Sequence, residues 1–131
     1  MAEGRRWVTS PVVGGIVGVF AGGMTILLLE AAGHRVFGTA NPLQGETVTT
    51  PMFMSVLVAW VVGAWVAGTV AAVWSKTASL VTGAVVGGVL LAGAVANLVA
   101  FPHPVWMMVA AVVLIPAASV LGFKLRMPRR A

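Results

Sequence analysis

Four long apolar stretches occupy most of this chain and restrict it to a narrow class of folds. They cover residues 11–33, 51–74, 78–101 and 104–125. An α-helix rises ~1.5 Å per residue, so each stretch is long enough to cross a ~30 Å hydrocarbon core. Only 8% of the side chains are charged, against about 25% in an average soluble domain. The sequence therefore predicts a single all-α integral membrane domain, residues 1–131, built as an up-down-up-down four-helix bundle.

The positive charges of the chain lie almost entirely on one side of these predicted helices. Arg35 falls in the predicted outer loop, residues 34–50, whereas the other cations flank the opposite helix ends: Arg5, Arg6, Lys76, Lys124, Arg126, Arg129 and Arg130. Because basic residues accumulate on the cytoplasmic side, this asymmetry predicts that the amino and carboxyl termini are both cytoplasmic. The net charge of +5 comes from these cations at the helix ends. Cations at helix ends face lipid head groups, so we expect the lipid bilayer, and not nucleic acid, to be the partner.

Small residues recur at every fourth position in three of the stretches. They are Gly14, Gly18 and Gly22 in the first stretch, Ala64, Gly68 and Ala72 in the second, and Ala84, Gly88, Ala92 and Ala96 in the third. Small side chains at this spacing allow two membrane helices to approach closely. Packing within the chain is the favoured interpretation, because four helices must first meet one another. A homo-oligomer or a larger membrane complex is compatible with the same pattern.

One acidic residue, Glu30, falls inside an apolar stretch, about one turn from its outer end. Charged side chains are costly in hydrocarbon, so such residues are candidates for functional sites. His34 follows at i+4 and shares the same helix face. Asn97 lies in the last turn of the third stretch and His103 lies just before the fourth, both at the outer end. The topology therefore predicts that Glu30, His34, Asn97 and His103 converge at a similar depth.

Three interpretations of this cluster are open. It can be a polar cap that ties the outer loop to the bundle, with Asn97 as a helix C-cap or an interhelical partner and His103 as an N-cap. It can be a site for a ligand or for proton transfer, since histidine titrates near neutral pH. The side chains of Glu30, His34 and His103 can also bind a divalent metal such as zinc. We favour the polar cap, and the sequence predicts no cofactor and no catalytic residue.

At these residues the chain resembles a group of small four-span bacterial membrane proteins of uncharacterised function. The matching residues are Glu30 with Gly33-His34, Ala59-Trp60 with Gly63-Ala64, Asn97, Pro102-His103-Pro104 with Trp106, Pro116-Ala117 and Gly122. The resemblance spans most of the chain. It implies a four-helix fold in a bacterial inner membrane, and it implies no activity.

The function we expect is that of a small non-enzymatic membrane protein, an accessory or assembly subunit whose small-residue faces mediate helix contacts. The scarcity of polar groups inside the spans favours it. The alternative is a small oligomeric transporter or channel, with Glu30 and the histidines at an outer vestibule. The inner halves of the spans offer only a few hydroxyls to such a path: Thr25, Ser55, Thr69 and Thr82. A membrane enzyme ranks last, because no nucleophile is paired with the histidines.

Overall fold

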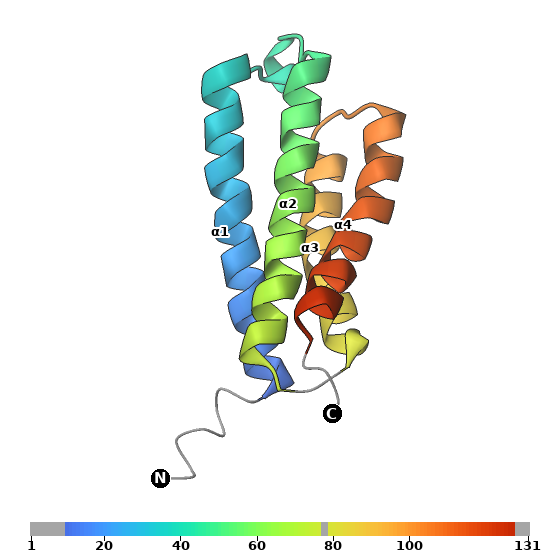
Figure 1. The fold of residues 1–131 in the computed structure, drawn as a ribbon. Coiled ribbons are helices and arrows are strands. Elements are labelled where there is room, and N and C mark those ends of the chain that lie inside the picture. Colours follow the sequence, from blue (N-terminus) through green and yellow to red (C-terminus); the bar gives the residue numbers. More distant parts are fainter. Residues whose placement is uncertain (1–9, 77–78, 128–131) are drawn as a thin grey trace.

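The computed structural model describes residues 10–76 and 79–127 of the chain, and helices make up most of this part. In chain order they are α1 (Pro11–Phe37), the short 3-10 helix η3 (Pro42–Gln44), α2 (Thr50–Trp74), α3 (Leu80–Ala100) and α4 (Val105–Arg126). The four α-helices run alternately up and down and pack side by side (Figure 1). This arrangement confirms the predicted all-α four-helix bundle.

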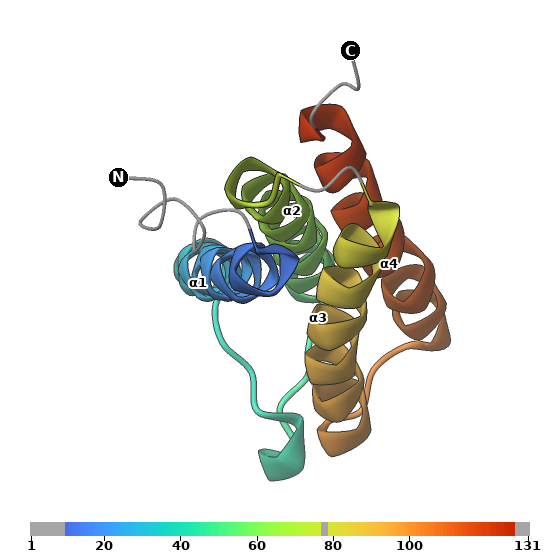
Figure 2. The same cartoon turned by 90° about the horizontal axis from the view of Figure 1, so that it is seen from below.

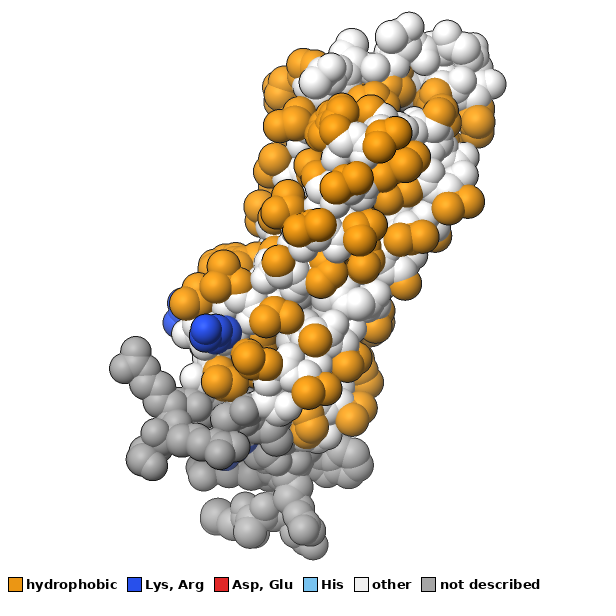
Figure 3. Space-filling view, turned by 90° about the vertical axis from the view of Figure 1, so that its right-hand side faces the viewer, with side chains coloured by type: hydrophobic (Ala, Val, Ile, Leu, Met, Phe, Trp, Pro, Cys, Tyr) orange, Lys and Arg blue, Asp and Glu red, His pale blue; other side chains and the backbone are white. Residues whose placement is uncertain are grey.

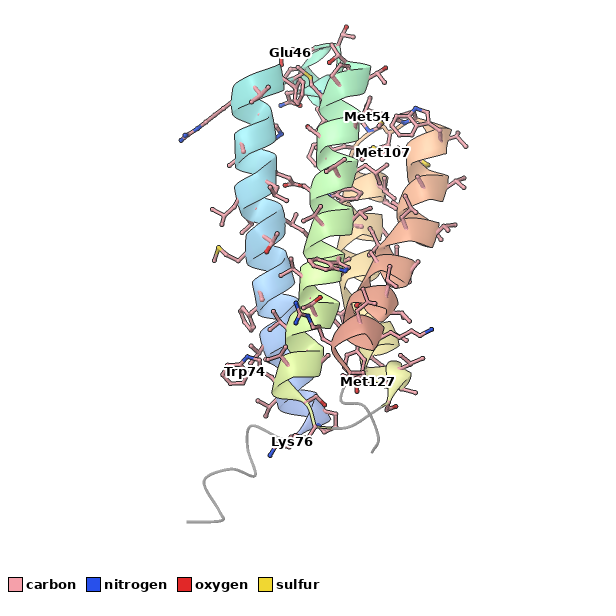
Figure 4. The ribbon with its side chains drawn as sticks, in the orientation of Figure 1. Glu46, Met54, Trp74, Lys76, Met107 and Met127 are labelled. Carbon is pink, nitrogen blue, oxygen red and sulfur yellow. The ribbon has the colours of Figure 1, made fainter. Side chains whose placement is uncertain are left out.

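All four α-helices are long and apolar enough to cross a membrane. The α1–α2 and α3–α4 connections lie at the upper end of the bundle in Figure 1, whereas α1 begins and α4 ends at the lower end. Figure 3 shows hydrophobic side chains over most of the length of one face, with Lys and Arg near its lower end. Glu46 marks the upper end, and Trp74 and Lys76 mark the lower end (Figure 4). These features describe a multi-pass membrane protein.

The ends of α1 follow local capping chemistry. At its start, Ser10 Oγ accepts a hydrogen bond from the Val12 N–H at 3.3 Å, which satisfies a donor that has no partner within the first turn. At its end the helix continues past the apolar stretch to Phe37 and stops at Gly38, whose φ of 85° is readily adopted only by glycine. The connection to α2 is therefore shorter than the loop predicted over residues 34–50.

α2 is the central helix of the bundle. It packs against α1 on one side and α4 on the other, and it also contacts α3 (Figure 2). Half of the most apolar window of α2 is buried, against 17% of that of α1. α3 packs mainly on α4 and only lightly on α1. α1 is thus attached to the bundle chiefly through α2.

Glycines form the closest contacts between helices. A Cβ atom placed on Gly14, Gly18 or Gly22 of α1 would lie 2.8, 2.5 or 2.6 Å from a backbone oxygen of α2. A Cβ atom on Gly68 of α2 would collide with the backbone of Ser119 in α4. These four glycines therefore lie where helix backbones touch. Gly88 of α3 is different, because a Cβ atom there would meet no described atom within 4 Å, so it makes no packing contact within this part of the chain.

Candidate functional site

A cavity of about 250 Å³ lies at the upper end of the bundle, against the α1–α2 connection. Its lining includes the four polar residues singled out from the sequence: Glu30 and His34 from α1, Asn97 from α3, and His103 from the α3–α4 connection. The structure therefore brings these four side chains to one cavity. Glu30 and His34 come from α1 and Asn97 comes from α3, and these two helices contact each other only lightly.

The α1–α2 connection is folded over this cavity by its own hydrogen bonds. The Asn41 N–H donates to Glu46 Oε2 at 2.6 Å, and the Asn41 side chain accepts from the Leu43 N–H at 3.0 Å. The second bond is a local side-chain turn that Asn commonly forms. Asn41 and Pro42 also line the cavity. The connection is thus a shaped wall of the site.

Glu30 is anchored to the bundle by a tryptophan of α2. The Trp60 Nε1–H donates to Glu30 Oε1 at 2.7 Å, and Trp60 itself is only 4% exposed. A buried indole N–H needs an acceptor, and a carboxyl oxygen makes the bond shorter and stronger than a neutral acceptor would. This bond holds Glu30 toward α2 at the level of the cavity.

His103 stands beside two aromatic rings. Its Nδ1–H donates to the backbone oxygen of Phe101 at 2.7 Å, because a carbonyl oxygen can only accept. In the neutral ring this leaves Nε2 as an acceptor. The centre of the imidazole lies 5.6 Å from that of Phe53 and 6.4 Å from that of Trp60. His103, Trp60 and Phe53 therefore form an aromatic wall next to the carboxyl group of Glu30.

The predicted helix caps in this cluster are wrong. The residue that ends α3 is Phe101, whose N–H donates to the backbone oxygen of Asn97, and the residue that begins α4 is Pro104. The Asn97 side chain instead lines the cavity, and His103 bonds within its own connection. Proline suits the N-cap position of α4 because its ring fixes φ at about −65°, and the φ of Pro104 is −67°.

Two further hollows lie below the upper cavity. One, of about 310 Å³, is lined by Glu30, Trp60 and Asn97 together with apolar residues of α1, α3 and α4. The next, of about 490 Å³, lies between the lower parts of α1 and α3 and is almost entirely apolar. The upper pair of hollows shares Glu30 and Asn97, and the lower pair shares Val19 and Val89. Glu30 thus stands where polar lining gives way to apolar lining.

The described part of the chain contains no group of three His, Cys, Asp or Glu side chains placed to hold a metal ion. The metal interpretation of Glu30, His34 and His103 therefore lacks a ligand set here. Chemically, the site offers a carboxyl group with one oxygen engaged by Trp60, an imidazole acceptor and an amide. Such groups suit the binding of a polar or positively charged group that donates hydrogen bonds.

Sequence reasoning missed Trp60 as the partner of Glu30. The signal was present, because an indole N–H inside a membrane helix requires an acceptor. Glu30 was the single acidic side chain within the predicted spans. What the sequence did not contain was the rotation of α2 that turns Trp60 toward α1.

Comparison with known families, curated proteins and solved structures gives no match for this chain. The resemblance to small four-span bacterial membrane proteins therefore stays a prediction.

Proposed function

We propose that this protein is a non-enzymatic accessory or assembly subunit in a bacterial inner membrane, and that α3 is the helix that contacts its partner. The observation that carries the proposal is the small-residue stripe of α3, which faces away from the bundle. All of its members are exposed: Ala84, Gly88, Ala92 and Ala96. The glycines of the corresponding stripe on α1 are buried against α2 instead.

An exposed stripe of this kind suits contact with another membrane helix. Lipid tails are as apolar as leucine, so helix association in a bilayer depends on close packing more than on hydrophobicity. Small side chains permit that packing, as α1 and α2 demonstrate within this chain. The partner is a transmembrane helix, either of a second copy of this chain or of another subunit.

The distribution of cations supports an orientation with both termini in the cytoplasm. Lys76, Lys124 and Arg126 lie at the lower end, and Arg35 lies at the upper end. Basic residues accumulate on the cytoplasmic side of bacterial inner-membrane proteins, so the lower end is the cytoplasmic one. Reporter fusions at the carboxyl terminus test this orientation.

Disulfide trapping tests the partner contact, because the chain contains no cysteine of its own. A cysteine at Ala92 should cross-link across the α3 contact in native membranes, to itself if the partner is a second copy. A cysteine at Val113, on an exposed part of α4, is the matched control and should not. Gly88→Leu should abolish the specific cross-link, because its side chain separates the helices. Equal trapping from both positions would refute the α3 contact.

Transport is the second candidate function. Glu30 supports it, because this ionisable side chain borders two adjoining hollows. Below that level, the Thr25 hydroxyl is bonded to the Ala21 carbonyl of its own helix, and the lower hollow is apolar. The geometry therefore favours holding a molecule over passing one. Proton flux into liposomes that disappears in Glu30→Gln would establish transport in place of the subunit role.

A further inference from the structure

We infer that the seam between α1 and α3 is a binding site for a membrane lipid with an ammonium head group, of the phosphatidylethanolamine class. The ammonium would donate to the carboxyl group of Glu30, and one acyl chain would follow the seam downward. This site is separate from the α3 stripe that carries the proposed function.

The seam provides a path of the right shape. Its three hollows adjoin one another through shared residues, Glu30 with Asn97 above and Val19 with Val89 below. The lowest hollow is bordered by Ile16 and Val85, which are more than half exposed at 53% and 59%. It is therefore open to the side, where a bilayer lipid would enter.

The depth of the two upper hollows matches one leaflet. Along α3, the segment from Asn97 to Val89 spans about 12 Å, and half of the hydrocarbon core is ~15 Å thick. The lowest hollow continues to Val81, about 24 Å from Asn97, which is deeper than one leaflet. A lipid with its head group at Glu30 would therefore place its acyl chain in the middle hollow and in the upper part of the lowest one.

Glycines keep this path open. A Cβ atom on Gly93, which lines the middle hollow, would meet no described atom within 4 Å. A Cβ atom on Gly15, which lines the lowest hollow, would approach only Val86 Cγ2, at 3.6 Å. These glycines differ from Gly18 and Gly22, because no helix backbone occupies the space beside them. The space beside these glycines is therefore available to the acyl chain of a lipid.

The polar end of the path selects the head group. Glu30 is an acceptor with one oxygen bonded to Trp60, and no Lys or Arg lines either of the two upper hollows within the described residues. A carboxylate attracts an ammonium and repels a lipid that is only anionic. The side chains of His34 and Asn97 line the same cavity and carry N–H groups for a phosphate oxygen.

Native mass spectrometry of the full-length chain tests this site. The purified protein is offered equal amounts of phosphatidylethanolamine and phosphatidylglycerol with identical acyl chains. We expect one retained phosphatidylethanolamine per chain, preferred over phosphatidylglycerol by about tenfold, the scale of a hydrogen bond to a charged group. Equal retention of the two lipids would overturn the inference.

Two variants separate the head-group contact from the chain path. Glu30→Gln keeps an acceptor for the Trp60 N–H and removes the charge, so retention of the two lipids should become equal. Gly93→Leu fills the middle hollow, so retention of both lipids should be lost. The helix itself should tolerate the change, because leucine has a higher helix propensity than glycine. An unchanged preference in the first variant, or unchanged retention in the second, would also overturn the inference.

Gly88→Leu is the matched control on the same helix. Gly88, like Gly93, has open space beside it, but it lines none of the three hollows. Lipid retention should therefore match that of the unaltered chain, while disulfide trapping through the α3 stripe is lost. Gly93→Leu should show the reverse. The two variants distinguish failure of the lipid site from failure of the proposed subunit role.

Discussion

Two faces of α1 carry glycines, and the molecule uses them in opposite ways. On the face toward α2, a Cβ atom on Gly18 or Gly22 would lie 2.5 or 2.6 Å from a backbone oxygen. Gly23 lies on the face toward α3, because it follows Val19 of the lowest hollow at i+4, and a Cβ atom there would meet no described atom within 4 Å. Glycine therefore lies at the tight contact of α1 with α2 and also beside its loose contact with α3.

This difference shows what holds a peripheral membrane helix in place. Close backbone approach on one face supplies many van der Waals contacts, which are the main attraction between helices in lipid. The Glu30–Trp60 hydrogen bond reinforces the same pair of helices at the upper end. Once α1 is fixed to α2 in this way, its contact with α3 need not be tight, and the seam can stay open.

The largest effect should come from closing the tight face. In Gly18→Leu, the new side chain would collide with the Ala67 oxygen and with Ala71 of α2, and neither helix backbone can yield cheaply. We expect the free energy of unfolding to fall by about 3 kcal/mol or more, at the upper end of overpacking effects. Reversible unfolding in mixed micelles measures it. Gly23→Leu is the control, and a comparable loss there would break the contrast between the two faces.

A smaller effect should follow from removing the hydrogen bond at the upper end. Trp60→Phe deletes the N–H that binds Glu30 and leaves a small void, so we expect a loss of about 2 kcal/mol. Trp65→Phe on the same helix is the control, since Trp65 is exposed and should change stability little. If both variants behaved alike in the same unfolding assay, the bond would not contribute to the α1–α2 pair.

The smallest of these effects concerns how α3 is held. The buried Ser119 Oγ of α4 donates to the Gly83 oxygen of α3 at 2.8 Å. Ser119→Ala should lower the free energy of unfolding by about 0.6 kcal/mol, the average for such bonds in a membrane protein. Ser55→Ala is the comparison, because the Ser55 hydroxyl donates to the Met52 oxygen of its own helix and so links no second helix within the described residues. A larger loss from Ser55→Ala would mean that α3 is not held by α4 through this bond.

The helices were predictable because length and hydropathy decide them. Each apolar stretch became one helix, and the convergence of Glu30 with Asn97 followed from antiparallel order alone. α1 is longer than the first apolar stretch, because hydropathy falls after residue 33 while the helix continues to Phe37 and stops at Gly38. Hydropathy locates the segment in lipid, but local backbone preference decides where the helix stops.

The faces of the helices were not predictable from the same pattern. Stripes of small residues occur on α1, α2 and α3, yet the stripe with Gly88 faces outward while the one with Gly18 is buried. All sides of these helices are apolar, so the sequence carries little information about rotation. The partner of Glu30 was hidden for the same reason, since Trp60 and Trp65 both lie on α2 and the rotation of that helix decides which of them faces α1.

One measurement tests most directly the claim that α1 is held by one glycine face and open on the other. It compares the free energies of unfolding of Gly22→Ala and Gly23→Ala, two one-methyl changes at adjacent residues, in the same bilayer mimetic. The Gly22 change should destabilise by about 1 kcal/mol or more through overpacking against Gly63 and Ala67. The Gly23 change should stabilise by about 0.5 kcal/mol through helix propensity. Effects of the same sign in both variants would contradict the account.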